Sequence, residues 1–331
     1  MMIIGFFVVI VIAGSLLLGY LYEQHASTEE RKKFLPPGSL VDLGGRHIHL
    51  FVKGIADGPT VVIEPGAGEP SMLWWFVQDQ IATFARVCTY DRPGYQWSDS
   101  PKLEASLEDR ARDLHEVLTR GNVPGPYVLV AHSYGGAIAR LFARDHLTDV
   151  AGVVLVDTPD EELLFGQRYA SVIAKCGWIL AVATFVMQTG IVRLWSALFA
   201  GRDQKAEPNL SSQAQHFWAM AFTPQGLKAA TDELASITRT PPALRAKGAF
   251  GLLGDVPLIV LAHGQPFPGM FATLEVGFRE SQIRLAALSS NSELIVVENA
   301  NHNINMDAPE IVVDAVKRIH HAARDRSRLQ V

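Results

Sequence analysis

Short apolar runs alternate with segments of helical periodicity along most of the chain. The apolar runs are rich in Val, Ile and Leu, and they predict strands at residues 60–64, 86–90, 127–131, 152–157, 257–262 and 293–297. Ahead of them, residues 40–52 predict a β-hairpin that turns at Gly44 and Gly45. Apolar positions at helical spacing predict helices at residues 72–84, 107–120, 134–146 and 309–324. Strands that are apolar on both faces and alternate with helices indicate an α/β protein with a mostly parallel sheet.

The first 22 residues form an apolar segment without a charged side chain. At about 1.5 Å per residue, a helix of this length crosses a hydrocarbon core of about 30 Å. A cleaved signal peptide would carry Lys or Arg ahead of a shorter apolar stretch, and this segment has neither feature. We therefore predict an uncleaved, single-pass membrane anchor at residues 1–22. Arg31, Lys32 and Lys33 follow it, so the positive-inside rule favours the cytoplasmic side for the rest of the chain.

A long insertion separates the strand that ends at residue 157 from the strand that begins at residue 257. The insertion is helical in pattern and rich in large apolar side chains, namely Trp178, Phe185, Met187, Trp195, Phe199, Phe217, Trp218, Met220 and Phe222. Because open α/β sheets bind ligands beyond the carboxyl ends of their strands, the insertion predicts a helical cap over that edge. A satellite core without a role in substrate binding is the alternative.

The predicted organisation is an anchor at residues 1–22, a linker at 23–37, a core in two parts at 38–159 and 253–325, a cap at 160–252 and a tail at 326–331. No second membrane span is predicted at residues 179–185, because Lys175 and Arg193 enclose only seventeen residues. We expect a buried or interfacial helix there.

The composition excludes several classes of protein. With 48% hydrophobic and 19% charged residues, the chain is not disordered. Lys and Arg number 29 against 34 Asp and Glu, so no nucleic-acid partner is expected. Cys88 and Cys176 lack the spacing of a metal site, and no phosphate-binding glycine loop of nucleotide type occurs. We therefore expect neither a metal nor another cofactor.

Residues 128–136 (VLVAHSYGG) carry the clearest chemical signal, because an apolar strand leads directly into a glycine-containing helix start. A sharp turn between strand and helix exposes its central side chain above the sheet, and small flanking residues let the backbone bend. Ser133 is central here, with Ala131 where the usual motif has its first glycine. Ser133 is therefore the candidate nucleophile, and a serine that only caps the turn is the alternative.

Two further segments make the chain similar to the α/β-hydrolase superfamily over residues 38–325. Residues 90–98 (YDRPGYQWS) resemble that superfamily's turn after the fourth strand, and His302, followed by Pro309, resembles its histidine after the last strand. The resemblance implies the α/β-hydrolase fold, a mostly parallel eight-stranded sheet flanked by helices with a cap inserted after the sixth strand. Here one N-terminal transmembrane helix would precede it.

A serine hydroxyl needs a base to take its proton, and His302 follows a predicted strand at the same sheet edge as Ser133. His263 also ends a strand and is a candidate to line the pocket, whereas His132 is expected to point away from Ser133 along the turn.

The acid that would orient His302 has several candidates. In the commonest arrangement of the superfamily it follows the strand at residues 257–262, where this chain has no carboxylate. Asp157 ends the preceding strand, 24 residues after Ser133, in a position that resembles haloalkane dehalogenases and some lipases. Glu275 and Glu298 are the alternatives. If one of them is the acid, Asp157 would only stabilise the loops beneath the cap.

Negative charge that develops on a substrate oxygen needs preset hydrogen-bond donors. The backbone N–H of Tyr134, directly after the nucleophile, is one candidate. Residues 64–68 (EPGAG) resemble the superfamily's H-G-x-x loop with Pro65 in place of its histidine, which implies that Ala67 supplies the second N–H.

A serine nucleophile favours acyl transfer, whereas epoxide hydrolases and haloalkane dehalogenases of this fold use aspartate. The leading hypothesis is a membrane-anchored serine hydrolase that cleaves a small apolar carboxylic ester through an acyl-enzyme. An amidase, peptidase or carbon–carbon bond hydrolase with the same residues is the second hypothesis. The third is a membrane-tethered protein that binds a ligand without catalysis.

Overall fold

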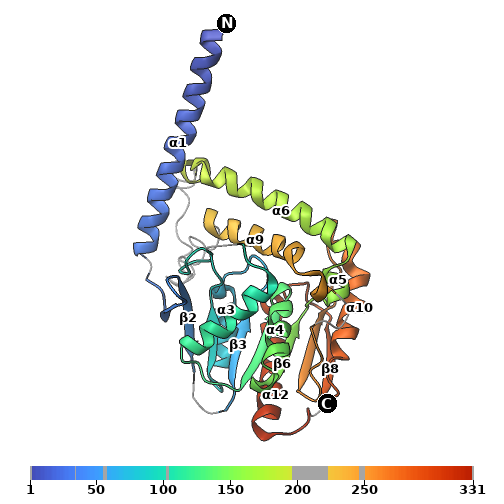
Figure 1. Cartoon of the computed structure of the whole chain (residues 1–331). Helices are drawn as coiled ribbons and strands as arrows, with labels where there is room; N and C mark the ends of the chain where they lie inside the picture. Colours follow the sequence, from blue (N-terminus) through green and yellow to red (C-terminus); the bar gives the residue numbers. More distant parts are fainter. Residues whose placement is uncertain are drawn as a thin grey trace.

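An eight-stranded sheet lies at the centre of the structure, in the strand order β1-β2-β4-β3-β5-β6-β7-β8 (Figure 1). The computed structural model describes residues 2–33, 35–54, 58–101, 104–195, 223–245 and 250–329. Its strands are β1 (Ser39–Asp42), β2 (His47–Lys53), β3 (Thr60–Glu64), β4 (Val87–Tyr90), β5 (Tyr127–His132), β6 (Val150–Val156), β7 (Leu258–His263) and β8 (Ser292–Val297). β1 and β2 run antiparallel to their neighbours and the other strands run parallel, which confirms the predicted mostly parallel sheet.

Helices cover both faces of the sheet. The helices α3 (Leu107–Arg120), α4 (Tyr134–Asp145) and α10 (Glu275–Ala286) pack into one apolar cluster, and α2 (Trp75–Ile81) and α12 (Pro309–Asp325) into the other. Every residue of β3, β5 and β7 is buried, which explains why these runs are apolar throughout. The predicted strand ends differ from the observed ends by at most two residues.

The described part of the chain between β6 and β7 is helical, as the pattern of residues 160–252 predicts. It contains α5 (Glu161–Leu164), α6 (Gln167–Gln188), α7 (Ile191–Trp195), α9 (Pro224–Arg239) and the 3-10 helix Pro242–Arg245. The long helix α6 lies over α9, which lies over the sheet (Figure 1). Phe199, Phe217, Trp218, Met220 and Phe222 lie outside the described residues.

The chain begins with one helix, α1 (Met2–Lys33), whose N-terminal part projects away from the sheet (Figure 1). The helix continues through residues 23–33, so this part of the predicted linker is helical. Its charged half is tied to α7, because Arg193 Nε lies 2.8 Å from Glu23 Oε2 and Arg193 Nη1 lies 2.6 Å from Glu30 Oε1. These ion pairs fix α1 against the helices between β6 and β7.

A buried ionic cluster joins α9 to the sheet. Arg92, just after β4, lies 2.7 Å from Glu64 at the end of β3 and 2.5 Å from Glu233 on α9, and all three side chains are at most 2% exposed. Burial acts to raise the pKa of Glu233, but the charges of Arg92 and Arg110 outweigh it and hold the pKa below its usual value. Glu233 is therefore an anion whose partners lie on the core.

We expect the substitution Glu233→Gln to lower the free energy of unfolding by about 3 kcal/mol, because it leaves the two buried cations Arg92 and Arg110 with the single carboxylate of Glu64. Asp232→Asn is the matched control, since it removes a neighbouring carboxylate of α9 whose ion pair, among the described residues, is with the exposed Lys228, and it should cost less than about 0.5 kcal/mol. Urea unfolding of the full chain in detergent measures both values. Equal losses in the two variants would contradict a structural role for the cluster.

Candidate active site

Ser133 stands at a sharp turn between β5 and α4. Its backbone has φ 49° and ψ −121°, an unfavourable conformation for a residue with a side chain, and its N–H donates to Val156 O at 3.0 Å. The turn brings α4 so close to β3 that a Cβ on Gly135 would lie 2.4 Å from Pro65 O. Glycine is therefore required there, and the side chain of Ser133 is presented at the carboxyl edge of the sheet, as the motif predicts.

The structure brings Ser133, His302 and Asp157 together at that edge, from the ends of β5, β8 and β6. His302 Nε2 lies 2.9 Å from Ser133 Oγ, and His302 Nδ1 lies 2.6 Å from Asp157 Oδ2. This geometry requires Nδ1 to carry a proton and leaves Nε2 free to accept one from the serine. The three side chains thus have the contacts of a nucleophile, a base and an orienting acid.

Asp157 has a second imidazole partner. His263 Nδ1 lies 2.7 Å from Asp157 Oδ1, and His263 Nε2 lies 3.2 Å from Glu275 Oε2. Burial acts to raise the pKa of Asp157, but hydrogen bonds from His263 and His302 outweigh it and lower the pKa to about 2. The carboxylate is therefore ionised at neutral pH and held from two sides.

The structure separates the three candidate acids. Glu275 contacts His263 and not His302, and Glu298 is exposed, with only its backbone packed against Gly264. His263 lies behind Asp157, not in the pocket where it was expected. Sequence reasoning placed both residues at strand ends, but their contact follows only from the fold, which makes β6 and β7 neighbours.

His132 does not point away from the site, contrary to expectation. Its ring centre lies 4.8 Å from that of His302, its Nε2 lies 2.9 Å from His302 O, and its Nδ1 lies 2.8 Å from Glu69 Oε1. Burial acts to lower the pKa of His132, but the charge of Glu69 raises it, and the pKa of Glu69 falls to about 2. The turn that exposes Ser133 places the preceding side chain beneath the loop that carries His302.

These neighbours set the charge of His302. Burial lowers its pKa below the usual value, and the positive charge of His132 acts in the same direction, whereas Asp157 opposes them. His302 is therefore neutral near pH 7, which is the state required of a base.

The loop after β3 is held so that Ala67 lies beside Ser133. Gly66 N–H donates to Glu69 Oε2 at 2.7 Å, and Gly68 N–H donates to Glu233 Oε2 at 3.1 Å. Ala67, between them, lines the same cavity as Ser133 and Tyr134. Within the described ranges, the N–H groups of Ala67 and Tyr134 have no acceptor from the protein. Two amides are thus available beside the serine oxygen.

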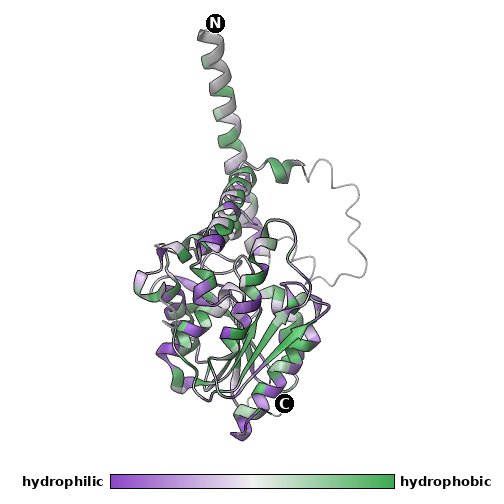
Figure 2. Ribbon diagram, turned by 90° about the vertical axis from the view of Figure 1, so that its right-hand side faces the viewer, coloured by the Kyte–Doolittle hydropathy of each residue, from purple (hydrophilic) through white to green (hydrophobic). Residues whose placement is uncertain are grey.

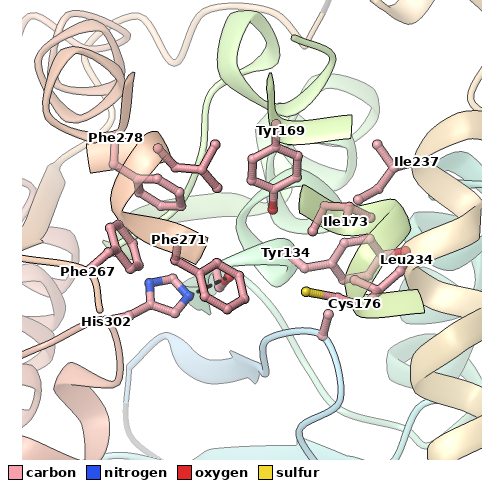
Figure 3. A pocket seen from close by; sticks show the side chains of 13 residues that line it. Tyr134, Tyr169, Ile173, Cys176, Leu234, Ile237, Phe267, Phe271, Phe278 and His302 are labelled. Carbon is pink, nitrogen blue, oxygen red and sulfur yellow. Dashed lines mark hydrogen bonds between the residues drawn. The ribbon is translucent and has the colours of Figure 1, made fainter. Parts of the chain in front are cut away.

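The cavity above Ser133 has a volume of about 230 Å³ and is enclosed by the sheet edge, by α6 and α9, and by residues 267–278 after β7 (Figure 3). Apart from Ser133, His302 and Ala67, its lining consists of Tyr134, Tyr169, Ile173, Cys176, Leu234, Ile237, Phe267, Phe271, Leu274 and Phe278. Neither a carboxylate nor a Lys or Arg side chain is among these lining residues. The cavity therefore suits an uncharged, apolar group.

Curated relatives match the chain over different lengths. Uncharacterized protein C23C11.06c of Schizosaccharomyces pombe is 26% identical over 231 residues, which cover 69% of this chain and 40% of that protein. YqjL of Bacillus subtilis, also uncharacterized, is 24% identical over 281 residues, 85% of this chain and 91% of that protein. An uncharacterized vacuolar membrane protein of Saccharomyces cerevisiae is 33% identical over 110 residues, 32% of this chain and 17% of that protein. The chain thus spans less than half the length of the first and third.

Solved structures share the fold at low identity. An esterase from Thermogutta terrifontis has a TM-score of 0.57 at 21% identity, over 85% of this chain and 98% of that chain. An epoxide hydrolase from Bacillus megaterium has a TM-score of 0.61 at 15% identity, over 85% and 99%. Proteins with different reactions are thus equally similar in fold, and the reaction must be argued from the site.

One family model matches residues 61–315, which include the turn at Ser133, the loop at Ala67 and His302. This match confirms the resemblance that residues 90–98, 128–136 and 302 carry, and the solved structures agree with it. The chain therefore belongs to the alpha/beta hydrolase family.

Proposed function

We propose that this hydrolase cleaves a carboxylic ester through an acyl-enzyme on Ser133. The observation that carries the proposal is the pair of contacts made by His302, 2.9 Å from the serine oxygen and 2.6 Å from the carboxylate of Asp157. A serine without such a base is a weak nucleophile at neutral pH. The neutral state of the half-buried His302 supports the same role.

In the proposed reaction, His302 Nε2 takes the proton of Ser133 as the serine oxygen bonds to the carbonyl carbon. The oxyanion accepts hydrogen bonds from the N–H groups of Ala67 and Tyr134, each of which contributes on the order of 100- to 1000-fold in rate. His302 then protonates the leaving alcohol as the carbon–oxygen bond breaks. Water, deprotonated by His302, releases the acid from the acyl-enzyme. Asp157 holds the tautomer of His302 and stabilises its charged form.

The cavity supports a small apolar acyl group as the substrate's recognised part. A volume of about 230 Å³ lies below the roughly 300–1,000 Å³ of sites for drug-sized ligands, so it suits a small group. Because α6 contributes Tyr169 and Ile173 and α9 contributes Leu234 and Ile237, we assign residues 160–252 the role of a cap over this cavity. The alternative amidase, peptidase or carbon–carbon bond hydrolase would use the same residues with another leaving group.

We also propose that residues 1–22 anchor the chain in a membrane as a single-pass helix. The absence of charged side chains over these residues and the projection of α1 from the sheet support this (Figure 1). The basic residues Arg31, Lys32 and Lys33 favour a cytoplasmic catalytic domain.

Replacing the nucleophile or the base is expected to abolish ester hydrolysis. Ser133→Ala and His302→Ala should each lower kcat by at least about 10⁴-fold, and Asp157→Asn by about 10⁴-fold. Nucleophile, base and orienting acid act together, so the loss of one removes the contribution of all three. The measurement is hydrolysis of p-nitrophenyl esters of graded acyl length by the full chain in detergent. His321→Ala, an exposed histidine of α12, is the control and should leave kcat unchanged.

Full activity in Ser133→Ala would overturn the proposal. A folded, unmodified protein that binds apolar ligands and hydrolyses no ester, amide or diketone would favour ligand binding without catalysis.

The substitution His132→Gln is expected to move the acidic limb of the kcat/KM profile to higher pH. It removes a positive charge 4.8 Å from His302, so the pKa of His302 rises and the base becomes protonated at a higher pH. Coulomb's law at that separation, even with the dielectric constant of water, gives a shift of about half a pH unit or more. Kinetics between pH 4 and 9, roughly spanning the titration of histidine, measure the limb. His321→Gln should leave it in place, and a limb that moves to lower pH would contradict this electrostatic account.

A further inference from the structure

The second half of α6 and all of α7 expose a row of large apolar side chains. Within this row Trp178 is 69% exposed, Phe185 60% and Trp195 63%. We call the row the docking face; it consists of Trp178, Ile179, Val182, Phe185, Val186, Ile191, Val192, Leu194 and Trp195. Its members on α6 recur at the spacing that places residues on one side of a helix. Figure 2 shows α7 as an apolar helix that stands out beside α1.

On α6, the docking face is confined to the half that approaches α1. The exposed polar side chains Gln167, Arg168, Ser171 and Lys175 lie in the first half of the helix. From Lys175 to Arg193 no charged residue occurs. An apolar surface with such a sharp limit indicates a specific apolar partner, since scattered exposed residues would alternate with polar ones.

The docking face is continuous with the apolar part of α1. A Cβ on Gly19 would lie 2.0 Å from Thr189 O, so the corner between α6 and α7 packs directly on the backbone of α1. Around this contact α1 itself exposes Leu16, Leu17, Leu18, Tyr20, Leu21 and Tyr22. Arg193, within the α7 part of the face, is the first charged residue after Lys175, and it is paired with Glu23 and Glu30. The charges begin at the same level on both helices.

The common position at which charged residues begin on α1 and α7 points to a lipid bilayer as the partner. The proposed span ends at Tyr22, and Gly19 lies one turn inside it, so the corner of α6 and α7 stands at the membrane boundary. Trp178, Trp195, Tyr20 and Tyr22 are exposed around the boundary, where Trp and Tyr side chains are enriched in membrane proteins. A soluble protein partner would not account for the shared boundary on the two helices.

The helix α6 does not itself cross the bilayer, although its most apolar stretch has a mean hydropathy of 1.8 and is only 11% buried. Its inner side packs on α9, where Tyr169, Val172 and Thr184 are buried. It therefore has one apolar side for the protein and one for lipid, as helices that lie in the interface have.

We infer that the docking face lies in the membrane interface, so that the cavity receives an ester dissolved in the lipid phase. Tyr169, Ile173 and Cys176, on the turns of α6 just before the docking face, line the cavity with Ser133. The inference rests on the proposed function for the anchor and for the ester. It adds that the substrate carries an apolar acyl chain and enters from the bilayer beside α6.

The first test is fluorescence of the full chain in vesicles of phosphatidylcholine with brominated acyl chains. Bromine quenches Trp that lies within the acyl region, so the quenching should be largely lost in the double variant Trp178→Phe, Trp195→Phe. Trp74→Phe is the spectroscopic control, because Trp74 is fully buried against the sheet and should contribute none of the quenching. Flotation of the same samples reports on α1 separately. A chain that floats with equal quenching in all variants overturns the inference and leaves the anchor standing, and a chain that does not float overturns both.

The second test compares two pairs of charge substitutions on exposed positions of α6. Val182→Glu with Phe185→Glu places two carboxylates on the docking face, and Gln167→Glu with Ser171→Glu places two on its polar half. The first pair should lower hydrolysis of an ester of a small acyl group with a long-chain alcohol, held in vesicles, by at least about tenfold, with a soluble short ester unchanged within about twofold. The second pair should leave both rates unchanged. Equal effects of the two pairs would overturn the inference, whereas hydrolysis of neither ester by the unmodified chain would count against the proposed ester chemistry alone.

Discussion

A buried carboxylate at the end of β6 organises the candidate site. Asp157 is fully buried, and an ion in that position costs several kcal/mol unless hydrogen bonds satisfy its oxygens. Two imidazoles do so, from His263 at the end of β7 and from His302 in the loop after β8. One anion therefore fixes the ends of three strands relative to one another, and the proposed base reaches Ser133 because of it.

A second buried carboxylate relates the helices over the cavity to the loop beside the serine. Glu233 of α9 binds Arg92 of the core and accepts the N–H of Gly68, next to Ala67. Leu234, the next residue of the same helix, and Ile237, about one turn further on, line the cavity. A displacement of α9 would thus alter the cavity wall and one proposed oxyanion donor together. Cavity shape and charge stabilisation are coupled through this one side chain.

The fold was predictable because its signals are local. Apolar runs such as β3 and β5 must be strands with both faces covered, and the turn at Ser133 needs only neighbouring small residues. The residues that surround the site could not be predicted in the same way. His132 contacts Glu69, and His263 contacts Asp157, only because the fold sets the order of the strands. The helical continuation of α1 to Lys33 depends likewise on Arg193, which lies far away in sequence.

The contact between Gly19 and Thr189 joins α1 directly to the helices over the cavity, where a flexible tether would leave the α/β-hydrolase domain free to turn. No side chain separates the two backbones, and the three partners of Arg193, namely Glu23, Ser27 and Glu30, recur on one side of α1. One residue inserted between Gly19 and Glu23 would rotate these partners by about 100° and lift them by about 1.5 Å. The number of residues between Gly19 and Glu23 therefore sets the distance and orientation of the cavity relative to the N-terminal segment.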